Sequence, residues 1–242
     1  MGKSGKTESE ELDLRSLNKR TKYIKIILLV SLALTVVVGI IFTAIFYTQR
    51  HEDTADDDVP SDPGDNEDNN IGNHQILDRT QWNGRPPIRI RNITAPVPLV
   101  VIKHTGGGTC TTFRVCAGKL QTIQSQAVGD GADDIYYNFL IGGDENIYVG
   151  RGWDVQPAQR DNIIDIVFMG SFTFDVPTAG MIEAAKLLIE DGAQKGKLTD
   201  DYKVVCHSQT ETTESPGLHL IEEVKTWPHY DPGSYRSRSL VR

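Results

Sequence analysis

The stretch Pro98-Leu99-Val100-Val101-Ile102-Lys103-His104 decides the fold of this 242-residue chain. Its centre is apolar and rich in β-branched residues, so it predicts a strand. Four further runs have the same character and are also predicted as strands: 137–142, 146–149, 163–169 and 202–206.

Helical patterns lie between these strands. Residues that are apolar except for Lys119 recur at helical spacing in three stretches: Val115, Lys119, Leu120, Ile123 and Ala127; Ile182, Ala185, Leu188 and Ile189; Leu220, Val224 and Trp227. Strands that alternate with helices predict an α/β domain with a mixed sheet covered by helices. A region of about 155 residues is long enough for one hydrophobic core.

Residues 26–47 form an unbroken apolar run. A helix rises ~1.5 Å per residue, so this run is long enough to cross a hydrocarbon core of ~30 Å. Basic residues precede it: Arg15, Lys19, Arg20, Lys22 and Lys25. Because basic residues favour the cytosolic side, we expect a single-pass anchor with residues 1–25 in the cytosol and the C-terminal domain outside the plasma membrane. The alternative is a cleaved signal peptide, whose apolar region is normally shorter, ~7–15 residues.

Residues 48–75 are rich in Asp, Asn, Gly and Pro and contain few apolar residues. Such a segment cannot bury enough apolar surface to offset the entropy of ordering, so it is predicted to be a flexible acidic stalk. Much of the net charge of −8 lies here. No basic surface is indicated, and no nucleic-acid partner is expected.

Blocks of sequence from the first strand onward resemble the peptidoglycan recognition proteins, relatives of bacteriophage-type N-acetylmuramoyl-L-alanine amidases. They occur in family order at 100–105, 134–143, 146–153, 213–217 and 227–229. The resemblance covers residues 76–231 and leaves a C-terminal tail at 232–242. It implies a single amidase-like α/β domain with a central mixed β-sheet and three main helices, here preceded by one transmembrane helix. The anchor makes the chain similar to the long membrane-bound members of insects.

In the amidase members of the family, zinc is held by a His at the end of the first core strand, a His at the end of the last strand and a Cys beyond it. The corresponding residues here are Lys103, His207 and Ser215. An ammonium group has no lone pair to donate, and a neutral hydroxyl is a far poorer ligand than a thiolate. Because a catalytic zinc needs three protein ligands, no metal, cofactor or amidase activity is expected.

Several residues near these positions have structural interpretations as well. His104 is adjacent to Lys103, but successive side chains of a strand face opposite sides, so His104 is not expected to replace the missing ligand. Ser215 followed by Pro216 could be the N-cap and first residue of the last helix. Tyr137 and Thr213 match family positions that assist the attack of zinc-bound water, and Tyr137 could equally be a packed aromatic.

Arg151-Gly152-Trp153 is the strongest indication of ligand binding. In family members that prefer diaminopimelate-type peptidoglycan, an Arg followed by Gly-Trp is similar to the group that pairs with the extra carboxylate of that amino acid. Lys103 would add a second cation where the metal is lost. The alternative for Arg151 is a structural role within its own loop. The candidate ligand-binding residues are Lys103, His104, Thr105, Tyr137, Arg151, Gly152, Trp153, His207, Thr213 and Ser215.

Two segments depart from the family pattern and weaken the expected binding. The first helix ends Gln126-Ala127-Val128 where the family has a His that lines the cleft, and residues 154–162 form a shorter loop that also lacks a family His. Both changes remove polar groups that would hydrogen-bond a glycopeptide.

The three cysteines are expected to have different roles. The resemblance implies a disulfide between Cys110 and Cys116, on the oxidising exterior side of the membrane. Cys206 lies in an apolar run and is expected to be a buried thiol. Asn92-Ile93-Thr94 is a sequon, so Asn92 is a candidate glycosylation site.

The expected function is that of a membrane-bound, catalytically inactive peptidoglycan recognition protein, a receptor or co-receptor in innate immune sensing. Its expected partners are muropeptides, of diaminopimelate type if Arg151 binds, and related receptors in a homo- or hetero-oligomer. One alternative is a regulator on the same fold that binds protein partners and no glycan. A zinc amidase is the least favoured alternative.

Overall fold

The computed structural model describes Ile40, residues 70–158 and residues 160–236. Asn66–Arg242 form one compact unit with its own core, so a fragment of these bounds is expected to fold by itself. No helix among the described residues is long and apolar enough to cross a membrane. The predicted anchor at 26–47 lies outside the described residues except for Ile40, as do the tail at 1–25 and most of the predicted stalk, so these remain predictions.

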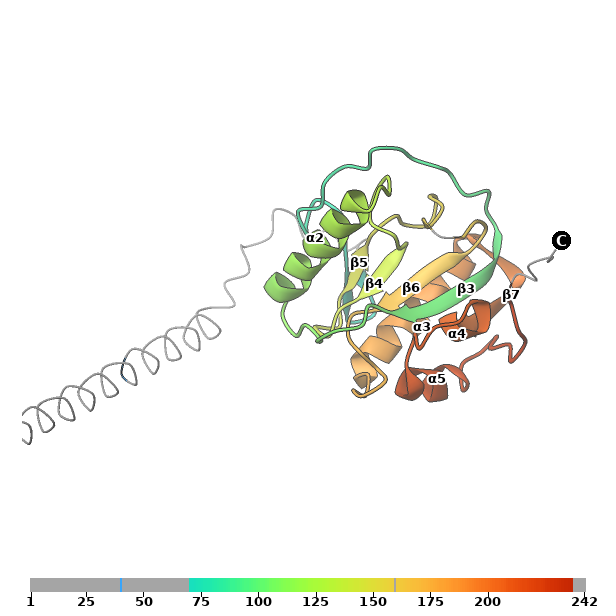
Figure 1. The fold of residues 1–242 in the computed structure, drawn as a ribbon. Coiled ribbons are helices and arrows are strands. Elements are labelled where there is room, and N and C mark those ends of the chain that lie inside the picture. Colours follow the sequence, from blue (N-terminus) through green and yellow to red (C-terminus); the bar gives the residue numbers. More distant parts are fainter. Residues whose placement is uncertain (1–39, 41–69, 159, 237–242) are drawn as a thin grey trace, which may run out of the picture. The chain divides into compact units, whose positions relative to one another are not determined.

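A central mixed sheet organises the described fold (Figure 1). Its strands are β1 (Asn70–Ile71), β2 (His74–Leu77), β3 (Val97–His104), β4 (Phe139–Ile141), β5 (Ile147–Val149), β6 (Ile164–Phe168) and β7 (Leu198–Cys206). Their order is β1-β2-β5-β4-β6-β3-β7. The pairs β2/β5, β4/β6, β6/β3 and β3/β7 are parallel, whereas β1/β2 and β4/β5 are antiparallel. The prediction of a mixed α/β sheet is confirmed.

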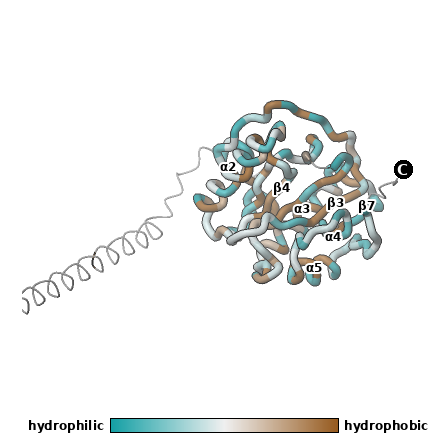
Figure 2. Tube along the Cα trace, in the orientation of Figure 1, coloured by the Kyte–Doolittle hydropathy of each residue, from teal (hydrophilic) through white to brown (hydrophobic). Residues whose placement is uncertain are grey.

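The three predicted helices are present as α2 (Phe113–Gly129), α3 (Ala179–Gln194) and α5 (Leu218–Val224). One short helix, α4 (His207–Thr210), was not predicted. On one face of the sheet, Ile102 and Ile166 belong to a core cluster with residues of α3 and α5. On the other face, Leu140 and Val167 pack against residues of α2. Figure 2 shows the apolar residues concentrated in the central strands between these layers.

The buried face of α2 differs from the predicted stripe. Val115 is 48% exposed, whereas Cys116 and Gln124 are buried. The predicted disulfide between Cys110 and Cys116 is confirmed, and it lies within the core on the α2 side of the sheet. Gln124 was missed because a polar residue does not signal burial; its amide exchanges hydrogen bonds with the backbone of Arg85.

The folded region begins earlier than the sequence predicts. β1 and β2 lie within or across the end of the segment 48–75 that was predicted as stalk. His74 is 5% exposed, and its Nδ1 lies 2.9 Å from the carbonyl oxygen of Glu145. A strand this short and polar carries no clear pattern, so the boundary predicted at residue 76 was too late.

The C-terminal segment is also folded in part. Tyr235 packs against a small cluster formed by Leu99, Val101, Ile163 and Val205. Its backbone N–H donates to the carbonyl of Gln209, 2.8 Å away. The domain boundary predicted at residue 231 therefore leaves out at least one residue that covers the sheet.

Candidate functional site

An ion pair joins the neighbouring strands β3 and β6, near the C-terminal end of β3 and the beginning of β6. Lys103 Nζ is 3.0 Å from Asp165 Oδ2, and the side chains are 5% and 1% exposed. β3 and β6 run parallel, with Val101 opposite Asp165 and Lys103 opposite Val167. Side chains two residues apart on a strand share a face, so Lys103 and Asp165 lie on the same face of the sheet. Burial raises the pKa of Asp165, and the ammonium of Lys103 acts in the opposite direction. The charge of Lys103 is thus balanced inside the protein.

Tyr137 lies beside this ion pair. Its ring centroid is 5.8 Å from Lys103 Nζ, close enough for a cation–π contact. Burial, with a smaller contribution from Asp165, raises the pKa of Tyr137 to about 12. The phenol is therefore protonated at neutral pH and cannot act there as a base.

His207 begins α4 directly after β7. Its Nε2 lies 2.5 Å from Glu211 Oε1, while Nδ1 is buried without a hydrogen-bond partner in the described part of the chain. Burial and the charge of Lys103 lower the pKa of His207 to about 4, although Glu211 favours the protonated form. The imidazole is thus neutral at pH 7, and Nε2–H donates to Glu211.

His104 and Thr105 connect β3 to the loop after β6. Phe172 N–H donates to His104 Nδ1 at 3.2 Å, and the two rings lie 6.4 Å apart. Phe172 belongs to the core on the α3 side, so His104 and Lys103 face opposite sides of the sheet. Thr105 Oγ1 accepts from Gly170 N–H at 3.1 Å. Burial lowers the pKa of His104.

Ser215 is not the N-cap that the sequence suggested. α5 begins at Leu218, and its N-cap is Gly217. Ser215 Oγ instead accepts from the backbone N–H of His104 at 3.0 Å, and its own N–H donates to Thr213 Oγ1 at 3.2 Å. Gly217 delays the helix because it has a φ of +91°, a conformation that favours glycine.

These residues do not fit a catalytic zinc. The ammonium of Lys103 is held by a carboxylate, and the hydroxyl of Ser215 is held by a backbone amide. His207 remains as a nitrogen donor, and one ligand is too few for a catalytic site. Within the described ranges, no group of three His, Cys, Asp or Glu side chains is placed to hold a metal ion.

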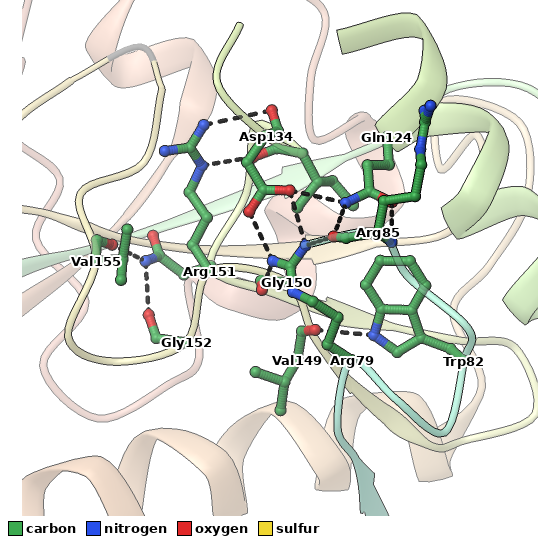
Figure 3. Close-up of polar contacts among 12 residues, drawn as sticks. Arg79, Trp82, Arg85, Gln124, Asp134, Val149, Gly150, Arg151, Gly152 and Val155 are labelled. Carbon is green, nitrogen blue, oxygen red and sulfur yellow. Dashed lines mark hydrogen bonds and ion pairs between the residues drawn. The ribbon is translucent and has the colours of Figure 1, made fainter. Parts of the chain in front are cut away.

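Arg151 lies in a separate polar network, which Figure 3 shows. Its side chain is buried, and it donates to three backbone carbonyls: Ile135 through Nε, Gln156 through Nη1 at 3.0 Å and Asp134 through Nη2 at 3.3 Å. The guanidinium thus joins two segments of its own loop region. These bonds use three of the five N–H donors of the guanidinium, so a ligand carboxylate would have to reach the remaining N–H groups of Nη1 and Nη2.

A second arginine supports the same region and was missed by sequence reasoning. Arg79 donates to both carboxylate oxygens of Asp134, at 2.8 and 2.6 Å, and to the carbonyl of Gly150 (Figure 3). Gln124 donates to Asp134 as well, at 2.8 Å. Arg79 lies near the predicted domain boundary, where neither spacing nor resemblance indicated a role.

Gly152 and Trp153 turn the chain toward the other side of the sheet. Gly152 has a φ of +67°. The ring of Trp153 lies 4.8 Å from that of Phe139, and it packs closely against Gly192 of α3. Trp153 therefore lies on the α3 side, opposite Lys103.

The structure brings together Lys103, Tyr137 and His207, with Asp165 as an unpredicted fourth member. Ser215 and Thr213 lie at the edge of this group through the contact with His104. A binding role for any of these residues remains a prediction. Asn92 is exposed, and its glycosylation remains a prediction too. Cys206 is buried, as expected, and burial raises the pKa of its thiol to about 12.

Comparisons with known proteins agree with this architecture. The family model for N-acetylmuramoyl-L-alanine amidase matches residues 93–218. Peptidoglycan-recognition protein SC2 of Drosophila melanogaster is 36% identical over 160 residues, which cover 64% of this chain and 87% of that protein. Peptidoglycan-recognition protein SA of the same species is 38% identical over 157 residues, covering 63% and 77%.

A similar solved structure contains tracheal cytotoxin bound to the ectodomain complex of peptidoglycan recognition proteins LCa and LCx. The matching chain is 39% identical, with a TM-score of 0.63, and the match covers 64% of this chain and 98% of that one. From this match, the relatives and the shared amidase-type domain, it follows that the chain belongs to the peptidoglycan recognition protein family.

Proposed function

We propose that this chain recognises peptidoglycan fragments without hydrolysing them and acts as a membrane receptor or co-receptor in innate immune sensing. The ion pair between Lys103 and Asp165 carries the proposal, because it occupies a position where the amidase resemblance requires a zinc ligand. A buried pair of this kind excludes a second cation from the same point. The bound tracheal cytotoxin in the related LCa and LCx complex supports a muropeptide as ligand.

Signalling would depend on assembly. The apolar run 26–47 is proposed as a single-pass anchor of the plasma membrane, with the domain outside the cell. The ectodomain complex of the related proteins LCa and LCx supports a signal that passes through a partner or an oligomer. Protease treatment of intact cells tests this arrangement: the domain should be accessible and membrane-attached, whereas a secreted form that starts near His51 would contradict it.

Hydrolysis is tested by incubating the fragment 66–242 with peptidoglycan and excess zinc, with an active amidase as positive control. No free muramic acid ends should appear above the level without protein. Cleavage that a chelator abolishes would overturn the inactive assignment.

The second candidate is a regulator that binds protein partners and no glycan. One observation favours it: the two cations expected to attract a muropeptide, Lys103 and Arg151, both have partners within the protein. Calorimetric titration of the fragment with diaminopimelate-type and Lys-type muropeptides separates the two functions. Measurable binding of the first type supports the receptor, and no heat from either supports the regulator.

A double variant shows whether Lys103 contacts the ligand. Replacing Lys103→Met together with Asp165→Leu removes the ion pair without leaving a buried charge. If Lys103 binds the ligand, this double variant should lose about tenfold or more in affinity. Unchanged affinity would restrict Lys103 to a structural role.

A further inference from the structure

An exposed apolar surface lies beside the start of α3 and α5. Phe174, Val176 and Leu218, which we call the Phe174 patch, are 82%, 71% and 59% exposed. A groove of about 570 Å³ adjoins the patch and is lined by Val176, Pro177, Ala179, Ile182, His219, Glu222 and Glu223. Large apolar side chains that are exposed together, next to a groove, are typical of a protein-binding surface.

The charge on this patch is unbalanced at one position. Glu222 pairs with Lys225 at 2.7 Å, and Glu223 pairs with Lys186 at 3.0 Å. Asp175 lies between Phe174 and Val176, is exposed, and makes no side-chain ion pair or hydrogen bond within residues 70–158 and 160–236. A partner should therefore carry apolar side chains next to a cation.

The segment 85–91, which we call the Ile88 segment, has this composition. Ile88 and Ile90 are 70% and 56% exposed. Between them, Arg89 is 74% exposed and only approaches Asp133, at 3.9 Å. Arg91 is engaged more closely, 3.0 Å from Asp161. Arg89 is thus the cation of this segment most available to a second molecule.

The two surfaces cannot meet within one molecule. The Ile88 segment precedes the start of β3, and the Phe174 patch follows the end of β6, which runs parallel to β3. They therefore lie at opposite ends of these strands; the segment is part of the long loop that leads into β3 in Figure 1. The residues 48–69 are no better candidate, because their many carboxylates would repel Asp175.

We propose that the Phe174 patch of one copy of this chain binds the Ile88 segment of a second copy, with Arg89 facing Asp175. The contact is head-to-tail, so each molecule uses one surface to receive and the other to donate. It requires no peptidoglycan fragment and is independent of the proposed receptor function. Repetition of the contact produces rings or short filaments rather than a closed dimer.

Reciprocal charge reversal tests the pairing. Sedimentation is measured over a range of concentrations, without ligand, on the full-length chain in detergent and on the fragment 66–242, which lacks the apolar run. Asp175→Lys alone and Arg89→Glu alone should each weaken self-association by about tenfold or more, because each brings like charges together. An equimolar mixture of the two variants should associate again, since both contacts in an alternating assembly then join opposite charges.

Two exposed apolar residues provide the matched control. Phe174→Ser should weaken association, and Val115→Ser on α2 should not, although both remove an exposed side chain. Association should also weaken as salt rises, because exposed charges are screened beyond about 8 Å at physiological ionic strength. A wild-type fragment that remains monomeric at several hundred micromolar and low salt overturns the proposal. So does a mixture of the charge variants that fails to associate while wild type does.

Discussion

Lys103 Nζ and Asp165 Oδ2 lie 3.0 Å apart in a part of the domain from which both side chains are almost excluded from solvent. The lysine occupies a position at which the family resemblance implies a zinc ligand, and the aspartate neutralises it. Because its ammonium is held by Asp165, Lys103 offers neither a lone pair to a metal ion nor an uncompensated positive charge to an anionic ligand. In the proposed receptor, Lys103 would contact the ligand despite this ion pair. In the alternative regulator, the ion pair would have only a structural role.

Removing one member of this pair should destabilise the domain strongly. Lys103→Ala leaves Asp165 buried without its cation, and breaking a buried pair in this way typically costs about 3–5 kcal/mol. The double variant Lys103→Met/Asp165→Leu should be within about 1 kcal/mol of wild type or more stable. Urea unfolding of the fragment 66–242 measures both. Equal losses in the single and the double variant would show that packing, rather than charge, dominates here.

The loss in Lys103→Ala should depend on pH. Without the ammonium, burial raises the pKa of Asp165 further above its ordinary value of 3.8. A carboxyl whose folded pKa is raised loses stability as the pH rises above its unfolded pKa, because the unfolded chain ionises first. The difference between wild type and Lys103→Ala should therefore be larger at pH 7 than at pH 4. A difference that is constant across this range would contradict an ionised Asp165.

His207 should make the domain sensitive to mild acid. Its pKa is lowered from 6.5 to about 4, so the unfolded chain binds more protons between these values. The free energy of unfolding should fall as the pH is lowered from about 6.5 to about 4, and part of this fall should be missing in His207→Gln. His219 is exposed, and His219→Gln serves as the control. An identical pH dependence in wild type and His207→Gln would refute the assignment.

The elements were predictable because their hydrophobic patterns are long. The strand 98–104 and the helix stripe near Leu188 both appear close to their predicted bounds. β1, β2 and α4 were missed because they have two to four residues each and include polar side chains, whereas the equally short β4 and β5 consist of hydrophobic residues. Contacts between side chains were harder to predict than the elements, because they depend on the register between strands that are distant in sequence.

Asp165 is a residue whose sequence context could have indicated the buried ion pair. It is a single acidic residue within the apolar run 163–169, and a buried carboxylate requires a partner. Lys103 has the same isolated position in its own strand. The sequence thus contained two buried charges of opposite sign, but only the parallel register of β3 and β6 shows that they share a face. The partners of Arg151 are backbone carbonyls, which every residue has, so the sequence could not indicate them.

Arg151 should contribute to stability even without ligand. Arg151→Ala leaves the carbonyls of Ile135, Gln156 and Asp134 without their donor, which should cost at least about 2 kcal/mol. Arg151→Lys should also destabilise, since an ammonium lacks the planar fork that reaches three acceptors. Arg89→Ala, at an exposed position, should change stability by less than about 0.5 kcal/mol. Unchanged stability in Arg151→Ala would favour a residue reserved for ligand.

Zinc binding should return only when two positions change together. Lys103→His supplies an imidazole near His207, and Ser215→Cys supplies a thiolate, so the double variant offers the three ligands of a catalytic zinc site. Each single variant offers two at most and should bind zinc no better than wild type. Metal content after dialysis, and the unfolding temperature with and without zinc, measure the effect; a ligand at a hundred times its Kd adds about 2.7 kcal/mol of stability. A folded double variant could also fail to retain zinc or to gain stability from it. That result would show that the position of the segment around Ser215, which contacts His104, prevents metal binding in addition to the identity of the ligands.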